Sequence, residues 1–286
     1  MKLFFSLLFS ATFVFSSTAF IKPKELRALI IKQNTILLDT TDKNTFKQGH
    51  IPSAINVDAM KFRKQVGLYQ LMESSKKIQK LFRSLGVNNN SHVVIYAHTK
   101  KKEFLKAGYL ALALVVNGFT NVSILDGGYT EWLEEYEDFI SMVDKDLKEG
   151  NFTAHFNPNI LVDLEYVRKS IGEVSMIESR PKRYYDAQAQ SKGVRRLGHI
   201  PKAKSSFWGN KFESDTMLKA DKELENIYIS QDKLKQNKEV IVYCTGGLEA
   251  SINWYILHQH FNFKDVKIYD ASMREWGNRD DTPMEK

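Results

Sequence analysis

The chain of 286 residues is 43% hydrophobic and 26% charged, which is the balance of a soluble globular protein long enough for two ordinary domains. Its formal charge of +7 comes from lysines interleaved with acids, and its aromatic residues lie in apolar runs, so nucleic-acid binding is disfavoured while small anions would still be attracted. The single cysteine excludes an internal disulfide.

The first 19 residues are typical of a secretory leader. A lysine at position 2 precedes an apolar run over residues 3–15, and the small residues Ser17 and Ala19 suit a cleavage site before Phe20. The run is shorter than the ~20 residues of a membrane-spanning helix, although an uncleaved anchor is the alternative. We therefore expect a signal peptide over residues 1–19, no stable membrane insertion, and an exported protein that is periplasmic or secreted.

Strands and helices alternate along the rest of the chain. In residues 20–147 the pattern predicts strands over 35–39, 54–57, 92–96 and 122–125, and helices over 23–32, 73–84 and 104–117. In residues 161–286 it predicts strands over 174–177, 239–243 and 266–269, and helices over 161–169 and 250–261. This alternation is typical of parallel sheets with helices on both faces.

Two short motifs occur once in each half of the chain. Gly-His-Ile-Pro begins at Gly49 and at Gly198, and a Glu-Trp pair begins at Glu131 and at Glu275. We therefore predict two similar α/β domains in tandem, residues 20–147 and 161–286. The segment between them, residues 148–160, is polar and is expected to be an exposed linker.

The only cysteine, Cys244, follows a strand pattern and precedes two glycines and a helix pattern. The first turn of a helix offers free backbone N–H groups and the positive end of the helix dipole, and both favour a thiolate. Gly246 and Gly247 allow those N–H groups to curl around one point. This arrangement indicates a reactive cysteine, and the alternative is a buried structural one.

Superposing the two halves of the sequence favours the reactive interpretation for one half only. When residues 93–96 are set on residues 240–243, Ala97 falls opposite Cys244 and His98 begins the segment opposite the glycine turn. The first half therefore has no nucleophile, which predicts one working domain and one degenerate domain.

These residues resemble the tandem-domain rhodanese family, the thiosulfate and 3-mercaptopyruvate sulfurtransferases, over nearly all of the mature chain. The motifs that carry the resemblance are Gly-His-Ile-Pro in both halves, Glu178-Ser-Arg180, Arg183-Tyr184, Cys244-Thr-Gly-Gly-Leu-Glu249, and the ending from Asp270 to Trp276. In that family the loop cysteine carries sulfur as a persulfide and the amino-terminal domain is inactive. Cys244 and Ala97 match those two roles.

The resemblance implies a reaction and a set of site residues. The Cys244 thiolate would attack the outer sulfur of a small anionic donor, thiosulfate or 3-mercaptopyruvate, and a thiophilic acceptor would collect it: cyanide, a thiol or a protein. No cofactor and no metal is implied. The expected substrate-binding residues are Arg183, Lys192, Thr245, Gly246, Gly247, Leu248 and Glu249. Arg183 and Lys192 would hold the anionic end of the donor, although a surface salt bridge is the alternative for each.

Several positions depart from the family pattern. Thiosulfate enzymes carry basic residues at loop positions two and three, where this chain has Thr245 and Gly246, and mercaptopyruvate enzymes have Gly-Ser-Gly after the cysteine. Glu249 stands where Thr or Arg is usual, and its negative charge would make the thiolate more costly unless it points outward. His50 lies where mercaptopyruvate enzymes have a cleft residue, but its twin His199 predicts a repeated structural turn. The donor is therefore left open.

Other functions fit the sequence less well. A cysteine phosphatase or arsenate reductase needs an arginine about six positions after the cysteine, and Ala250 stands there. The spacing of the seven histidines does not indicate a cysteine protease. His258 and His260 point to different sides of a helix, which disfavours a zinc site. The alternative from another class is a binding or sulfur-carrier protein that uses the fold without fast turnover.

Overall fold

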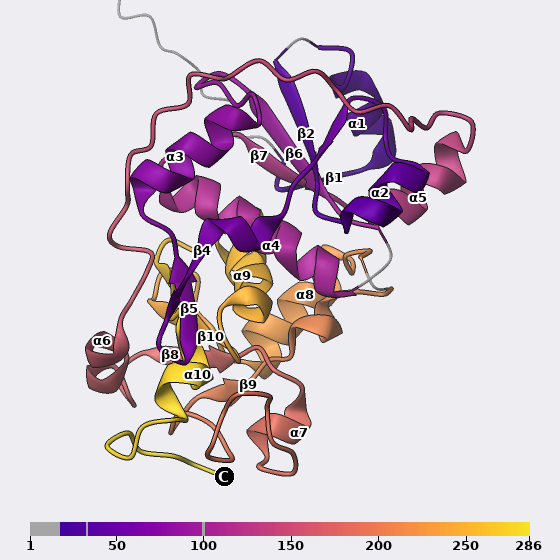
Figure 1. Ribbon diagram of the computed structural model, residues 1–286. Helices are drawn as coiled ribbons and strands as arrows, with labels where there is room; N and C mark the ends of the chain where they lie inside the picture. Colours follow the sequence, from indigo (N-terminus) through magenta and orange to yellow (C-terminus); the bar gives the residue numbers. More distant parts are fainter. Residues whose placement is uncertain (1–17, 33, 99–100, 215) are drawn as a thin grey trace, which may run out of the picture.

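The computed structural model describes residues 18–286 except 33, 99, 100 and 215 (Figure 1). Most of the predicted leader, residues 1–17, lies outside the described residues. Within the described part, no helix combines the length and the apolar character that crossing a membrane requires. The structure confirms two α/β domains, each with a parallel sheet flanked by helices.

The first domain has a five-stranded sheet in which all the neighbouring strands are parallel, with the order β1-β7-β6-β2-β3. Its strands are β1 (Phe20–Ile21), β2 (Thr35–Asp39), β3 (Ala54–Asn56), β6 (His92–Tyr96) and β7 (Val122–Leu125). Its helices are α1 (Pro23–Leu29), α2 (Lys43–Gln48), α3 (Ser75–Ser84), α4 (Lys101–Val116) and α5 (Gly128–Tyr136). Helices α3 and α4 share a core with one face of the sheet, and α1, α2 and α5 share a core with the other.

Strand alternation explains why both faces of this sheet are apolar. In β2, Ile36 and Leu38 belong to the core under α3 and α4, whereas Leu37 belongs to the core under α1, α2 and α5. Successive side chains of a strand point to opposite faces, so a strand covered on both sides needs a continuous apolar run.

The second domain repeats this plan with a four-stranded parallel sheet in the order β11-β10-β8-β9. Its strands are β8 (Ser175–Glu178), β9 (Lys204–Ser205), β10 (Val240–Tyr243) and β11 (Val266–Ile268). Its helices are α6 (Leu164–Lys169), α7 (Lys182–Tyr185), α8 (Asp221–Glu225), α9 (Leu248–Tyr255) and α10 (Ser272–Trp276); π-helical turns extend α8 as η3 (Asn226–Gln231) and α9 as η4 (Ile256–His260). The cysteine loop joins β10 to α9.

The two domains share one apolar core rather than meeting at a wet interface. The largest core cluster contains residues of both sheets and of both α4 and α9, which lie side by side in Figure 1. Gly108 of α4 permits this approach, because a Cβ there would lie 2.3 Å from Ile252 Cδ1 of α9. A short 3₁₀ turn, η1 (Ala59–Phe62), and a hairpin of β4 (Arg63–Val66) and β5 (Tyr69–Met72) extend from the first domain toward the second.

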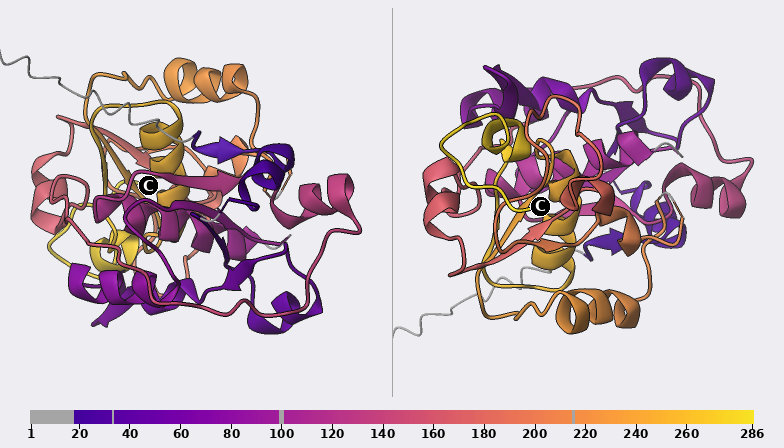
Figure 2. Two further views of the ribbon diagram at one scale, coloured as in Figure 1. Left: turned by 90° about the horizontal axis from the view of Figure 1, so that it is seen from above. Right: turned by 90° about the horizontal axis from the view of Figure 1, so that it is seen from below.

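The linker is mostly exposed, as the sequence predicted, but it is anchored to the core at Phe152 and Ile160. It follows the outside of the first domain (Figure 2), but Phe152 is buried in the shared core, and its backbone N–H donates to the carbonyl of Val87 at 3.0 Å. The N–H of Gly150 donates to the carbonyl of Arg83 at 2.8 Å, and a Cβ at Gly150 would lie 2.0 Å from the Val87 oxygen. Nine of the 13 linker residues are exposed, as predicted, and the buried exceptions, Phe152 and Ile160, anchor this polar segment to the core.

The Gly-His-Ile-Pro motifs form the repeated structural turn that was predicted. The His50 ring stacks on Phe46 with centroids 3.8 Å apart, and its Nδ1 lies 3.0 Å from the Phe46 carbonyl. The His199 ring stacks on Tyr185 at 3.6 Å, and its Nδ1 lies 2.9 Å from the Tyr185 carbonyl. Both rings are used in building their own domains.

Candidate active site

Cys244 lies at the end of β10, at the bottom of a loop that leads into α9. Gly247 adopts a left-handed φ of +88° at the start of the helix, and its N–H donates to Cys244 Sγ at 3.1 Å. On the other side, the N–H of Cys244 donates to Ser272 Oγ at 3.1 Å and its carbonyl accepts from Met273 at 3.1 Å. Backbone N–H groups of Gly246, Gly247 and Ala250 therefore act on the sulfur as predicted, and Ser272 and Met273 of α10 hold the backbone of Cys244.

The Cys244 thiol is nevertheless difficult to deprotonate in this structure. Cys244 is 1% exposed, and this burial together with the charge of Glu249 raises the pKa of its thiol to about 12, although the N–H groups of Ala250, Gly246 and Gly247 act in the opposite direction. The expectation of an easily formed thiolate was wrong for this form, because desolvation outweighs the loop N–H groups.

Glu249 is half-buried, and its charge acts on the Cys244 thiol. Burial raises the pKa of its carboxyl group, whereas the nearby polar groups of Thr245, the charge of Arg180 and the Cys244 thiol act against this rise. The concern raised by the sequence is therefore confirmed, since a carboxylate faces the sulfur and opposes its ionisation.

A buried ion pair lies on one side of the loop. The Arg180 guanidinium binds Glu178 through two hydrogen bonds, one of them 2.7 Å long from Nη2 to Oε2, and also donates to the Gly198 carbonyl at 2.8 Å. Arg180 Nη1 lies 3.3 Å from Ser191 Oγ, which lies 3.5 Å from Thr245 Oγ1. Burial raises the pKa of Glu178 to about 7. The sequence singled out the Glu178-Ser-Arg180 motif but gave this pair no role.

The first domain holds the other side of the loop. Arg63 of β4 donates from Nη2 to the carbonyl of Gly246 at 2.6 Å and lies 3.5 Å from Asp270 Oδ1. Asp270 Oδ2 accepts from the Tyr109 hydroxyl at 3.0 Å and from the Met72 N–H at 2.7 Å. We call Arg63, Tyr109, Met72 and Asp270 the latch. No sequence pattern pointed to Arg63, because it reaches the loop from another domain.

The loop must have glycine where the latch approaches it. A Cβ on Gly247 would lie 2.0 Å from Asp270 Oδ1 and 3.0 Å from the Asp270 carbonyl oxygen. Since φ at Gly247 is also left-handed, both space and backbone conformation exclude a larger residue.

The two cations expected to bind the donor lie at the surface. Arg183 Nη2 donates to the Tyr184 hydroxyl at 3.1 Å, and its guanidinium lies over the Tyr184 ring at 4.8 Å from the centroid. Lys192 is exposed and follows Ser191, which borders the loop. Their roles in binding a donor stay predictions, as do those of Thr245, Gly246, Gly247, Leu248 and Glu249.

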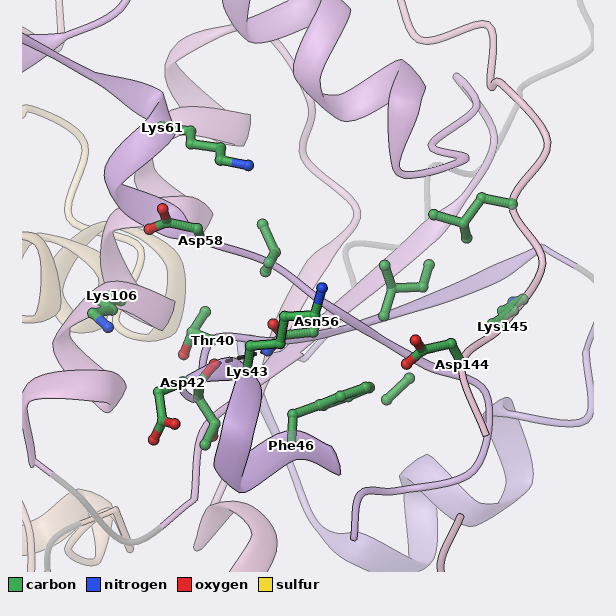
Figure 3. Close-up of a pocket in the computed structure, with 15 residues that line it drawn as sticks. Thr40, Asp42, Lys43, Phe46, Asn56, Asp58, Lys61, Lys106, Asp144 and Lys145 are labelled. Atoms are coloured by element: carbon green, nitrogen blue, oxygen red, sulfur yellow. Dashed lines mark hydrogen bonds between the residues drawn. The ribbon is translucent and has the colours of Figure 1, made fainter. Parts of the chain in front are cut away.

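The corresponding edge of the first domain has a different arrangement. Ala97 follows β6 there, and His98 forms a 3.1 Å contact from Nε2 to Asp39 Oδ2 and stacks on Tyr129 at 4.0 Å. A cavity of about 640 Å³ opens beside the carboxyl ends of β2 and β3, with Thr40, Asp42 and Asn56 among its lining residues (Figure 3). Among the residues that the structure describes, no group of three His, Cys, Asp or Glu side chains is placed to hold a metal ion.

Residues 22–135 and 163–279 both match the rhodanese-like domain, and the chain therefore belongs to the rhodanese family. The family predicted from the sequence is confirmed.

Named relatives of this chain move or carry sulfur. The chain is 29% identical to the 3-mercaptopyruvate sulfurtransferase of Escherichia coli K12 over 85% of this chain and 87% of that one. It is 26% identical to a sulfur carrier protein of Thermus thermophilus over 92% and 91% of the two chains. The crystal structure of SseA from Escherichia coli, described as a 3-mercaptopyruvate sulfotransferase, has a TM-score of 0.77 at 25% identity, covering 90% of this chain and 99% of that one. These relatives support sulfur transfer as the general activity.

Proposed function

We propose that this protein transfers a sulfane sulfur from a small anionic donor, thiosulfate or 3-mercaptopyruvate, to a thiophilic acceptor through a persulfide on Cys244. The observation that carries the proposal is the position of Cys244 Sγ, which accepts the N–H of Gly247 at the head of α9. Because loop N–H groups point at the sulfur, they can stabilise negative charge on it and on a sulfur bonded to it.

Two steps make up the proposed reaction. In the first, the Cys244 thiol loses its proton and attacks the outer sulfur of the donor. The bond between that sulfur and the rest of the donor breaks, and sulfite or the enolate of pyruvate leaves with the electron pair. In the second, the acceptor attacks the outer sulfur of the persulfide and Cys244 leaves as a thiolate. Cyanide would become thiocyanate, and a thiol would become a persulfide.

The experiment that tests this proposal is an intact-mass measurement. Purified protein is incubated with thiosulfate or with 3-mercaptopyruvate, and part of each sample is then treated with cyanide. We expect the gain of one sulfur atom, its removal by cyanide, and neither change in a Cys244→Ser variant that keeps its fold. Because Cys244 is the only cysteine, the site of any added sulfur is unambiguous. No gain from either donor, with the thiol still titratable after unfolding, would overturn the proposal.

A second candidate, a slow sulfur carrier that passes its persulfide to a protein, is favoured by the pKa of about 12 at Cys244. The named carrier among the relatives adds to its support. Time courses separate the two functions. A carrier would take up one sulfur per chain and turn over only when a protein acceptor is added, whereas an enzyme would turn over with cyanide or a small thiol.

We also propose that the protein is exported and cleaved near Ala19, for which the support is the pattern of the leader. The carbonyl of Ala19 accepts hydrogen bonds from the Ile124 N–H at 2.8 Å and from the Tyr255 hydroxyl at 3.0 Å. A cut directly after Ala19 would turn that carbonyl into the carboxylate of the released leader, and the mature protein would lose both hydrogen bonds. Amino-terminal sequencing of protein collected from the native host's exported fraction tests the proposal, and an intact residue 1 there would overturn it.

A further inference from the structure

The loop that follows Cys244 has no positively charged side chain that could bind the anionic donor of the proposed reaction. Residues 245–249 contain no lysine or arginine, and the one charged side chain among them, Glu249, is acidic. A donor that carries a carboxylate or a sulfonate would approach this loop against the charge of Glu249. The two cations predicted from the sequence, Arg183 and Lys192, are exposed, so a further cation packed against the loop would favour binding of such a donor.

The side chain of Arg274, in α10, packs against this loop. Its backbone N–H donates to the carbonyl of Thr245 at 2.9 Å, which fixes the start of the side chain beside the loop. A Cβ on Gly246 would lie 3.3 Å from Arg274 Cδ and 3.8 Å from Nε. The arginine stem therefore occupies the space into which a side chain at loop position three would begin to grow.

The same side chain also borders the segment that carries Lys192. A Cβ on Gly193 would lie 3.5 Å from Arg274 Nε, so the guanidinium end of Arg274 lies between the loop and this segment. Asn278 holds the two together, because its Nδ2 donates to the carbonyls of Gly193 and Arg274, both at 2.8 Å. Arg274 and Lys192 thus border the same side of the loop.

Arg274 differs from the other arginines near the site in having no partner. Arg63 and Arg180 bind carbonyl and carboxylate oxygens, as described above. Within the part of the chain that the structure describes, the Arg274 guanidinium makes no hydrogen bond and no ion pair, and its Nε is buried. A half-buried cation without a partner is stabilised by an incoming anion, and a planar guanidinium matches a carboxylate or a sulfonate in shape.

We infer that Arg274 binds the anionic end of the sulfur donor and takes the place of the cations that this loop lacks. The inference rests on the proposed function and adds a residue that would bind the carboxylate or sulfonate of such a donor. Gly246 belongs to the same device, because its missing side chain leaves room for the arginine.

The test uses two alkylating reagents of similar size, anionic iodoacetate and neutral iodoacetamide. Both modify the single cysteine, so the ratio of their rate constants reports the charge around Cys244 and does not require sulfur transfer. We expect Arg274→Gln to lower the iodoacetate-to-iodoacetamide ratio about tenfold at low ionic strength, with a smaller effect in salt. The matched control is Arg279→Gln, which removes the same charge from an exposed residue that pairs with Asp281; its ratio should match the unmodified protein.

The outcomes separate this inference from the proposed function. A ratio in Arg274→Gln equal to that of the control would overturn the role of Arg274, even if both rates had changed through a disturbed loop. A lowered ratio in a protein that gains no sulfur from either donor would keep the cation and overturn the proposed function. Where sulfur is gained, Arg274→Gln should also raise the donor KM about tenfold; an unchanged KM would contradict binding by Arg274.

Discussion

Replacing Glu249 with glutamine should make Cys244 more reactive. The carboxylate raises the pKa of the thiol, and its share of the rise is smaller than that of burial. Glutamine keeps the size and shape of the side chain and removes the charge. The substitution therefore isolates the electrostatic share, and Cys244 stays buried in both proteins.

The size of the effect follows from the pKa of Cys244. At about 12, against an ordinary value of 9.0, roughly one thiol in 10⁴ is ionised at pH 8. We expect the loss of one facing carboxylate to lower this pKa by about one unit, which raises the thiolate fraction about tenfold. A thiolate of lower pKa is also less nucleophilic, by a factor of about three per unit. The net expectation is that alkylation becomes about threefold faster at pH 8.

The assay is the rate of iodoacetamide alkylation of Cys244 between pH 7 and 10. Because this range lies below the thiol pKa, the rate should rise about tenfold per pH unit in both proteins, with the Glu249→Gln profile displaced upward. The exposed Glu173→Gln variant is the control for loss of one negative charge. Slower alkylation in Glu249→Gln would refute the reasoning, since it would mean that the carboxylate helps by accepting the thiol proton.

Two other substitutions test the residues on either side of the loop. Arg183→Ala should raise the donor KM about tenfold with little change in kcat if this arginine binds the donor equally in the ground and transition states. Steady-state kinetics measure both constants, and a fall in kcat alone would contradict this role. Arg63→Met should lower the free energy of unfolding by about 3 kcal/mol, because it leaves the buried Asp270 without its cation. Urea denaturation measures this, the Arg63→Met/Asp270→Leu double variant should regain part of the loss, and a change in Arg63→Met below about 0.5 kcal/mol would exclude a stabilising latch.

The strands were the easiest elements to predict from the sequence. The predicted ranges 35–39, 92–96 and 122–125 agree with β2, β6 and β7 residue for residue, because strands covered on both faces must be apolar throughout. Helix α2 was missed, since it is short and presents only Phe46 to the core; the Asp42 side chain caps it by accepting from the N–H groups of Asn44 and Thr45. Local capping of that kind gives no periodic pattern.

The β4–β5 hairpin was also missed, for a different physical reason. Apolar and polar residues do not alternate regularly along its two short strands, Arg-Lys-Gln-Val and Tyr-Gln-Leu-Met, so periodicity gives no strand signal. What holds it in place is contact with the second domain: Arg63 reaches Gly246, 183 positions further along the chain. Interactions of that range cannot be inferred from one sequence without a fold to bring them together.

Part of the candidate site could likewise be predicted from the sequence, and part depended on the fold. The loop from Cys244 to Glu249 was found because it is continuous in sequence and follows a strand. The inward direction of Glu249 could be raised only as a question, and the dominance of burial over the loop N–H groups was not foreseen, because exposure of the sulfur depends on both domains. Arg274 was passed over since it stands in the motif that ends each repeat, where Thr130 occupies the corresponding position of the first domain.

The first domain supports the cysteine loop of the second domain, although it has no cysteine of its own. Each domain donates one backbone N–H to the aspartate that follows the last strand of the other: Met72 to Asp270 and Leu218 to Asp126, both at 2.7 Å. This reciprocal pattern follows from the repeat. The hairpin of the first domain adds Arg63 and thereby fixes the Gly246 carbonyl, whereas the matching segment of the second domain packs Phe212 against Phe104. The two domains thus share the reciprocal contact to an aspartate, and the domain without a cysteine holds the cysteine loop of the other domain in place through Arg63.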